Sequence, residues 1–258
     1  FGVNLTILPA ITPPPYEEYA QAIVGSGIKI VETAGRSPEP FMELFKAYDV
    51  KVIHKCTSVR HSLKAQSVGC DAVTIDGFEC AGHPGEDDIP SLVLLPQAAE
   101  ALDVPVVGCG GFSDAKSLVA ALALGAEGIA MGTRFMATKE SLIHQNVKDK
   151  MTVSDELSTN LMFRTMHNTA RVFKNTISDQ VVEIESTGTA KFEDVQDLVA
   201  GQRGRGVFEV GDLEAGIWSA GISVARVKDV PTCEELISRM VSDAEAIMDG
   251  RLKEVRVS

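Results

Sequence analysis

The sequence predicts an α/β protein: a (β/α)8 barrel, with six of its eight βα units present in this chain, and a mainly helical cap domain. Short runs of β-branched residues alternate with longer segments of helical spacing, which is typical of parallel βα units. Polar and glycine residues gather just after the strands, where a barrel carries its active site. An open, doubly wound sheet also tolerates six strands and is the alternative architecture.

Each predicted strand begins one βα unit. The strands are expected at residues 3–7, 28–32, 50–53, 72–75, 104–107 and 128–131, and the helices at 17–24, 40–47, 59–67, 91–102, 115–124 and 140–148. Gly25, Gly69 and Gly125 fall where helices commonly end in a left-handed residue. Because the units recur about every 20–30 residues, eight would occupy about 200 residues. The two missing units are expected to be the first two.

The βα rhythm stops after the sixth strand. The following segment is expected to hold helices at 157–173, 192–199 and 217–227, with a glycine-rich stretch at 201–216. A last amphipathic helix at 234–248, capped by Thr232, is expected to return to the barrel. The predicted domains are therefore a barrel domain at 1–136 (strands three to eight), a helical cap at 137–230 and a terminal helix at 231–258.

The amino-acid composition excludes several classes of binding partner. The 24 basic and 36 acidic residues give a net charge of -12, which repels nucleic-acid phosphates. No apolar run approaches the ~20 residues that a membrane span needs. Five cysteines without a C-x-x-C pair suggest neither a disulfide framework nor a zinc site, so we expect a cytoplasmic protein with small-molecule ligands.

Two glycine turns follow the last two predicted strands. Gly110-Gly111 precedes a helix, and Gly132-Thr133 follows the next strand. Glycines let backbone N–H groups approach a phosphate, and the loops after strands seven and eight bind phosphate in many barrels. This match supports numbering the six strands three to eight. The alternative is that these glycines only form tight turns.

The connection that follows Asp76 is the longest of the βα loops. Its His83 lies among glycines, so the backbone can approach a planar ligand and the imidazole can exchange a proton near neutral pH. Alternatively, His83 is simply solvated. The acidic residues Glu86, Asp87 and Asp88 are expected to be charges at the start of the next helix rather than metal ligands.

Lys55 lies at the end of a predicted buried strand. A lysine there needs an anionic partner, which is either Asp76 on the next strand or a ligand. Arg203 and Arg205 are expected to pair with carboxylates. The glycines around them follow no strand, so a dinucleotide-binding fingerprint is excluded.

Several motifs together resemble the nitronate monooxygenase (2-nitropropane dioxygenase) family of flavin barrels, and most closely its bacterial branch of FMN-dependent NADH:quinone reductases. The similarity covers essentially the whole chain. It implies that about 70 residues carrying the first two strands of the barrel precede Phe1. The motifs are Phe1-Gly2-Val3-Asn4-Leu5, His54-Lys55-Cys56, Asp76-Gly77, Ala81-Gly82-His83-Pro84-Gly85, Gly110-Gly111-Phe112, Met131-Gly132-Thr133-Arg134-Phe135 and Trp218-Ser219-Ala220-Gly221.

The resemblance implies FMN as the cofactor and NADH as a cosubstrate. It implies that Lys55 stabilises charge on the reduced ring and that His83 faces the substrate. The remaining cofactor-binding residues would be Gly110, Gly111, Gly132 and Thr133 at the phosphate, and Asn4, Thr6, Asp76 and Ala81 along the ribityl chain and ring.

The predicted function is an FMN-dependent NAD(P)H:quinone reductase, with a possible homodimeric state. Its nearest rival is a nitronate monooxygenase that oxidises alkyl nitronates with oxygen, and reduction of an enoyl thioester is a third possibility. Outside redox chemistry, the alternatives are an isomerase or aldolase that uses Lys55 as a Schiff-base amine, and an inactive binding remnant.

Overall fold

A computed structural model describes residues 1–8 and 14–255. Its backbone contacts divide the chain into two compact units, each described by itself below. Within the described residues, the first unit comprises 1–76, 91–108 and 121–129, and the second comprises 77–90, 109–120 and 130–255.

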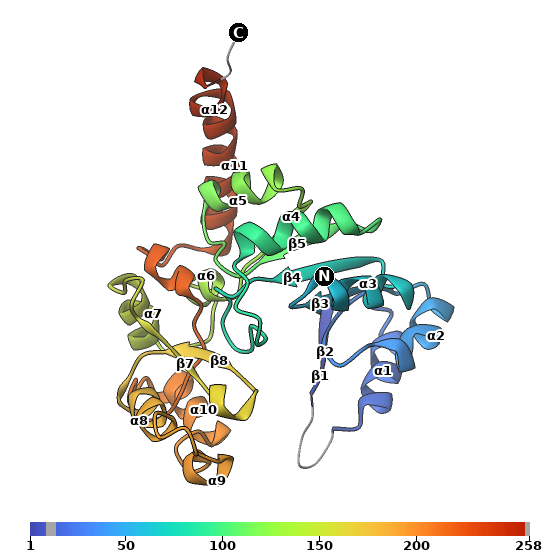
Figure 1. Cartoon of the computed structure of the whole chain (residues 1–258). Helices are drawn as coiled ribbons and strands as arrows, with labels where there is room; N and C mark the ends of the chain where they lie inside the picture. Colours follow the sequence, from blue (N-terminus) through green and yellow to red (C-terminus); the bar gives the residue numbers. More distant parts are fainter. Residues whose placement is uncertain (9–13, 256–258) are drawn as a thin grey trace. The chain divides into compact units, whose positions relative to one another are not determined.

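A six-stranded parallel sheet is the centre of the first unit (Figure 1). The strands follow one another in chain order, from β1 at one edge to β6 at the other. A doubly wound sheet reverses direction at a switch point, whereas a barrel adds each strand beside the previous one. The α/β barrel prediction is therefore confirmed over the doubly wound alternative. The strands are β1 (Val3–Ile7), β2 (Ile30–Gly35), β3 (Lys51–Cys56), β4 (Ala72–Asp76), β5 (Val106–Cys109) and β6 (Gly128–Ala130).

Helices connect these strands close to the predicted positions. Helices α1 to α4 each contact a strand next to them in the chain. Ser58 accepts a hydrogen bond from the His61 amide and so caps α3, which has the predicted bounds. The helices are α1 (Tyr16–Gly25), α2 (Glu39–Ala47), α3 (Val59–Ser67), α4 (Ser91–Ala101) and α5 (Ala115–Ala123).

Alternation along β1 separates a core face from a polar face. Leu5 and Ile7 are buried, whereas Asn4 and Thr6 are exposed. Because successive strand residues point to opposite faces, both polar side chains lie on the same side of the sheet.

The second unit holds the remaining elements. They are α6 (Thr133–Met136), α7 (Gln145–Thr152), β7 (Thr159–Met162), the 3-10 helix η1 (Arg164–Met166), β8 (Ala170–Phe173), α8 (Thr176–Glu185), α9 (Phe192–Val195), α10 (Gly201–Val210), the 3-10 helix η2 (Ile222–Arg226), α11 (Cys233–Asp249) and α12 (Arg251–Glu254). Most of them are helical, as expected. The division into barrel, cap and terminal-helix domains stays a prediction.

The helix predicted at 157–173 is wrong, because this segment forms an antiparallel β-hairpin of β7 and β8. Phe163 and His167 adopt left-handed backbone conformations, which a continuous helix cannot contain. The Glu185 carboxylate of α8 accepts hydrogen bonds from the amides of Phe163 and Thr165. This contact between distant residues selects the hairpin over the helical pattern of the sequence.

Four further helical segments differ from the prediction: the helix expected at 192–199 is shortened to α9, that at 217–227 is the 3-10 helix η2, and the other two concern α10 and α7. The glycine-rich stretch forms α10, because its glycines serve close packing rather than a turn: a Cβ on Gly204 would lie 2.5 Å from the Ile217 carbonyl oxygen. The helix expected at 140–148 begins later, at α7, where His144 accepts a hydrogen bond from the Asn146 amide.

Aromatic residues form the core of the second unit. Trp218, the only tryptophan, is buried and stacks on Phe173 with ring centroids 4.1 Å apart. Phe208 meets the indole edge-on at 6.4 Å. The fluorescence of Trp218 therefore reports unfolding of this unit.

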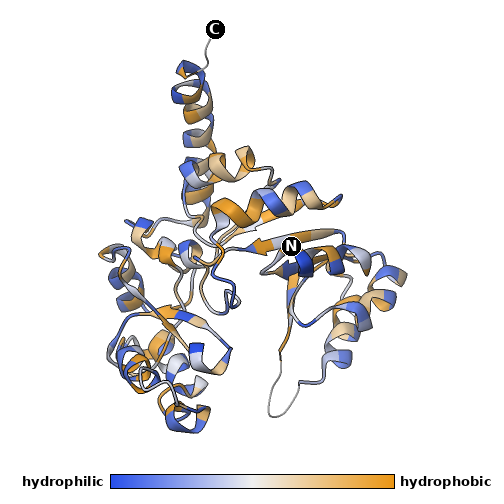
Figure 2. Ribbon diagram, in the orientation of Figure 1, coloured by the Kyte–Doolittle hydropathy of each residue, from blue (hydrophilic) through white to orange (hydrophobic). Residues whose placement is uncertain are grey.

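Helix α11 confirms its sequence prediction. The Thr232 side chain accepts a hydrogen bond from the Glu235 amide, and the Glu235 carboxylate accepts one from the Thr232 amide. The two bonds form a capping box. Hydrophilic and hydrophobic residues alternate along the helix (Figure 2), and its buried Ala244 packs with Ala115 and Val119 of α5. In the described part of the chain, no helix combines the length and apolarity needed to cross a membrane.

His54 predicts a pH dependence of stability. It is buried on β3, where its Nδ1 lies 2.8 Å from the Thr33 hydroxyl, and desolvation lowers its pKa. The native state therefore binds a proton less readily than the unfolded chain. This contribution to stability is complete above about pH 6.5 and is lost as the pH falls below that value.

Urea unfolding followed by circular dichroism from pH 8 to 5 measures this effect. We expect His54→Gln to flatten the acid loss of stability, and His167→Gln, at an exposed turn, to retain the wild-type slope. Equal slopes for wild type and His54→Gln would contradict the assignment.

Candidate functional site

A polar cluster occupies the sheet of the first unit. The Glu32 carboxylate of β2 accepts a hydrogen bond from Asn4 Nδ2 at 2.8 Å and lies 3.7 Å from Lys55 Nζ. Thr6 donates its hydroxyl hydrogen to Asn4 Oδ1 at 2.6 Å, and the Thr74 hydroxyl lies 3.5 Å from Glu32 Oε1. We call Asn4, Thr6, Glu32, Lys55 and Thr74 the strand-end cluster.

Strand register explains how distant residues meet in the strand-end cluster. Asn4 lies beside Glu32 in the pairing of β1 with β2, and Lys55 lies beside Thr74 in the pairing of β3 with β4. Parallel neighbours are about 4.8 Å apart, so side chains on one face are within contact distance. The structure thus brings together Asn4, Thr6 and Lys55, three of the predicted site residues.

Asp76 ends β4 and is buried, with 8% of its surface exposed. A buried carboxylate at a strand end is typical of a site that binds a polar ligand. The structure gives Lys55 an anionic partner that the sequence did not suggest, Glu32, whose Oε1 lies 3.7 Å from Lys55 Nζ. The sequence alone predicts no role for Glu32, although a glutamate within the apolar run Ile30-Val31-Glu32 is a usable signal.

The first glycine turn, Gly110-Gly111, belongs to the second unit and has positive φ at both residues, 85° and 84°. A Cβ on Gly110 would lie 2.8 Å from the Gly77 carbonyl oxygen and 3.1 Å from the Cys80 amide nitrogen. The turn is therefore packed against the loop that follows β4, and both its conformation and its contacts require glycine at position 110.

The second turn, Gly132-Thr133, differs from the first. Gly132 has a φ of -89°, which suits any residue, and no atom lies within 4 Å of a Cβ built on it. Thr133 is buried, and its hydroxyl oxygen accepts a hydrogen bond from the Gly221 amide at 2.9 Å. Gly132 therefore borders open space, while Thr133 is fixed by the protein.

Gly221 joins the second turn to the loop after β4. A Cβ on Gly221 would lie 2.9 Å from the Glu79 carbonyl oxygen and 3.3 Å from the Ala81 amide nitrogen. The Ile222 amide also donates to the Glu79 carbonyl oxygen at 3.0 Å. Together with Gly110 beside Cys80, these contacts bring four predicted residues of the second unit into one region. They are Ala81, Gly110, Gly111 and Thr133.

His83 lies on this same loop as an exposed residue. The surrounding protein nevertheless lowers its pKa by desolvation, and the Glu86 carboxylate partly opposes the shift. The imidazole is therefore mostly neutral at pH 7 and can accept a proton.

The β7–β8 hairpin holds the loop in several places. Gly82 and Arg171 exchange two backbone hydrogen bonds, of 2.6 and 3.0 Å. Glu86 accepts hydrogen bonds from the amide and hydroxyl of Thr169. Asp88 pairs with Arg164. Glu86 and Asp88 therefore bind the hairpin, which corrects the expectation that they serve as charges at a helix start.

Arg171 is the central residue of this attachment. Its buried guanidinium donates to the Phe78 carbonyl oxygen from Nη2 at 2.9 Å and lies 4.6 Å from the Phe78 ring centroid. Burial lowers the pKa of Arg171, which shows that the buried charge costs desolvation energy. The hydrogen bonds of its guanidinium to the Phe78 carbonyl oxygen offset part of this cost.

Replacing Arg171 by Met should loosen the loop without unfolding the unit, because an apolar side chain of similar length can occupy the same space. We expect amide exchange at residues 78–85 to accelerate about tenfold or more, measured by hydrogen–deuterium exchange with mass spectrometry. Arg203→Met, which removes a guanidinium that donates to the Ala215 and Asp197 carbonyl oxygens elsewhere in the same unit, is the matched control. Unchanged exchange in Arg171→Met would show that the backbone bridge alone holds the loop.

The model of one protein family, described as nitronate monooxygenase, matches residues 3–243. The chain belongs to the nitronate monooxygenase family. The sequence-based family prediction is thereby confirmed.

Curated proteins that are similar in sequence to this chain carry the names of oxidoreductases. A (3aS,4S,5R,7aS)-5-hydroxy-7a-methyl-1-oxo-octahydro-1H-indene-4-carboxyl-CoA dehydrogenase from Rhodococcus jostii is 28% identical, over 97% of this chain and 79% of the relative. A probable nitronate monooxygenase from Staphylococcus aureus is 26% identical over 84% of this chain. The match spans only 62% of that relative's length.

Solved structures agree with the fold. FabK from Thermotoga maritima superimposes with a TM-score of 0.90 at 25% identity, covering 99% of this chain and 79% of FabK. A nitroalkane oxidase from Streptomyces ansochromogenes gives a TM-score of 0.79 at 22% identity, covering 96% of this chain and 81% of the oxidase. The latter likeness concerns the fold alone.

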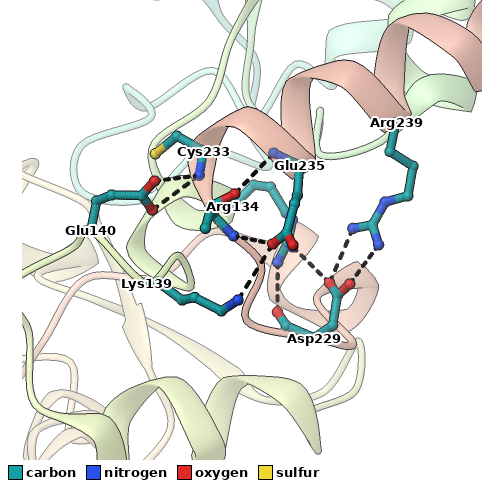
Figure 3. A network of polar contacts seen from close by, with 8 residues as sticks. Arg134, Lys139, Glu140, Asp229, Cys233, Glu235 and Arg239 are labelled. Carbon is teal, nitrogen blue, oxygen red and sulfur yellow. Dashed lines mark hydrogen bonds and ion pairs between the residues drawn. The ribbon is translucent and has the colours of Figure 1, made fainter.

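A charged network follows the second turn in this member of the nitronate monooxygenase family (Figure 3). Arg134, buried next to Thr133, donates to Asp229 Oδ1 at 2.7 Å, and Arg239 of α11 donates to Asp229 Oδ2 at 2.6 Å. The Glu140 carboxylate accepts the Cys233 amide. The segment after the turn is thus attached to the start of α11, which stabilises the position of Thr133.

Three residues in these arrangements had no predicted role. Glu32 and Arg171 act through partners that are distant in the chain, which a sequence cannot display. Gly221 belongs to a motif that carried the family resemblance, and that motif was the available signal for it.

Proposed function

We propose that this protein is an FMN-dependent oxidoreductase. The open position at Gly132 is the observation that carries the proposal: in the second unit it borders open space beside a fixed Thr133, and the Gly110-Gly111 turn of the same unit packs on the loop that also contacts Gly221. A Cβ would fill this space, so the residue fits a ligand that comes close to the backbone.

The chemistry of the donors suits a phosphate monoester. The first turn of any helix leaves backbone N–H groups without intrahelical acceptors, and Thr133 is the first residue of α6. The Thr133 hydroxyl accepts from Gly221, so its own hydrogen is available to donate. We assign Gly110, Gly111, Gly132 and Thr133 to the FMN phosphate.

The strand-end cluster suits the flavin end of the cofactor. Lys55 would hold a positive charge for the N1–C2 edge of the ring, while Asn4, Thr6, Asp76 and Ala81 would orient the ribityl chain and ring. The Lys55–Glu32 ion pair suits an electrostatic role for Lys55 better than that of a Schiff-base amine. When bound, FMN would accept two electrons from one substrate and pass them to another.

His83 would hold or accept a proton at an imidazole nitrogen on the substrate side. Its lowered pKa favours the neutral form that such a role requires. The hairpin would keep the loop in place while the proton moves.

For the organic substrate we propose a coenzyme A thioester. The Rhodococcus jostii relative, a carboxyl-CoA dehydrogenase, matches 97% of this chain and supports this class. An alkyl nitronate is the second candidate, supported by the family description and the Staphylococcus aureus relative. NADH:quinone reduction, with NADH as cosubstrate, stays a prediction of the family resemblance.

The visible spectrum of the purified protein, before and after addition of FMN, tests the cofactor. Flavin absorbance, or saturable binding of added FMN, is expected. A colourless protein that does not bind FMN would exclude the proposal.

Anaerobic stopped-flow reduction with three donors then separates the substrates. We expect saturated acyl-CoA thioesters to bleach the flavin. Bleaching by propionate 3-nitronate would instead indicate a nitronate monooxygenase, and bleaching by NADH a quinone reductase. Oxygen and quinone consumption identify the acceptor.

A further inference from the structure

Glu32 is the hub of the strand-end cluster. Its two carboxylate oxygens face partners from three other strands: Asn4 on β1, Lys55 on β3 and Thr74 on β4. Asn4 extends the contacts further by accepting the Thr6 hydroxyl hydrogen. Removing Glu32 would therefore disturb every other member of the cluster.

Stability of the fold does not explain this glutamate. About 30% of its side chain is exposed, as is 28% of the Lys55 side chain, and ion pairs this open to water contribute little to folding. A charged residue within a β-branched strand also runs against strand propensity. Residues that break such local preferences are typical of functional sites.

We propose that Glu32 is a positioning residue that holds Lys55 and Asn4 and sets how strongly the protein prefers reduced over oxidised FMN. The inference rests on the proposed function. With Glu32 ionised, the Lys55–Glu32 pair has no net charge, whereas without it the pair is cationic. The carboxylate therefore moderates the attraction of Lys55 for the negative charge that FMN gains on reduction.

Glu32→Gln tests this effect with little change of shape. The amide oxygen can still accept from Asn4, but the negative charge is gone. We expect the affinity for reduced FMN, relative to oxidised FMN, to increase about tenfold. The readout is the pair of dissociation constants, titrated aerobically and under dithionite, together with the midpoint potential of bound FMN.

Asp71→Asn is the matched control. Asp71, just before β4, pairs with Lys51 at 2.9 Å, and Lys51 is the first residue of β3, so Asp71→Asn removes the same charge from an ion pair at the opposite end of that strand. We expect it to leave the ratio of affinities unchanged. Glu32→Asp, which keeps the charge on a shorter side chain, should retain a ratio close to the wild-type value and serves if Glu32→Gln does not fold.

The double variant Glu32→Gln/Lys55→Met identifies the partner. If Glu32 acts through Lys55, Glu32→Gln should change the ratio of reduced to oxidised FMN affinity much less in the Lys55→Met background than in the wild type. A shift of equal size in both backgrounds would overturn the positioning role.

The outcomes separate the two proposals. If the wild type binds FMN but Glu32→Gln leaves the ratio of reduced to oxidised FMN affinity unchanged, the inference is overturned and the proposed function stands. A wild type that binds neither form of FMN overturns both. A tenfold increase in Glu32→Gln, absent in Asp71→Asn, supports the inference.

Discussion

Replacing Lys55 by Met should slow reduction of bound FMN by about 10²–10³-fold, the usual effect of removing one preorganised group from a site where charge develops. Lys55 is the penultimate residue of β3, and its ammonium lies 3.7 Å from the Glu32 carboxylate. Its position is therefore set before a substrate binds. Anaerobic stopped-flow absorbance at the flavin maximum measures the rate.

The fold should tolerate this substitution, because a partly exposed ion pair contributes only about 0–1 kcal/mol. Lys51→Met is the matched control, since Lys51 lies on the same strand and pairs with Asp71. It should reduce FMN at the wild-type rate. A Lys55→Met protein that melts normally and reduces FMN as fast as the wild type would falsify the role of Lys55.

Gly132→Ala should weaken FMN binding by at least about tenfold, a loss of about 1.4 kcal/mol or more, while folding is unharmed. The new Cβ enters the open space that we assign to the phosphate, and a φ of -89° accepts alanine without strain. Stability should even rise by about 0.4–1 kcal/mol, because alanine restricts the unfolded chain. Riboflavin, which lacks the phosphate, should bind both proteins equally.

Gly110→Ala is the informative contrast. Its Cβ would lie 2.8 Å from the Gly77 carbonyl oxygen at a φ of 85°, so this variant should lose stability together with binding of both FMN and riboflavin. The fluorescence of Trp218 follows its unfolding. If Gly132→Ala also weakened riboflavin binding, the open space would serve the ring or ribityl chain instead of the phosphate.

Much of the proposed site could be predicted from the sequence, because its residues follow strands in a recognisable order. Lys55, Asp76 and the two glycine turns are each defined by their position after an apolar run, a pattern typical of barrel active sites. The distinction between the turns was not readable. Both contain glycine, yet only the Gly110-Gly111 turn has positive φ, and in that turn a Cβ on Gly110 would clash with the backbone.

The hairpin shows the limit of periodic patterns. Residues 157–173 carry apolar side chains at helical spacing, but the Glu185 carboxylate binds the amides at the reversal. A hydrogen bond between residues about twenty positions apart leaves no periodic trace in the chain. The same reason concealed Arg171 and its attachment to the Phe78 carbonyl.

The amino-acid sequence alone determined the order of strands and helices in the barrel units, the capped helix α11 and the family, since these depend on local spacing, capping and contiguous motifs. Only the tertiary structure decided which charges meet. Glu32 became the partner of Lys55, and Glu86 and Asp88 became partners of the hairpin. Electrostatic pairing depends on distances in space, and the register of separate strands and loops sets those distances.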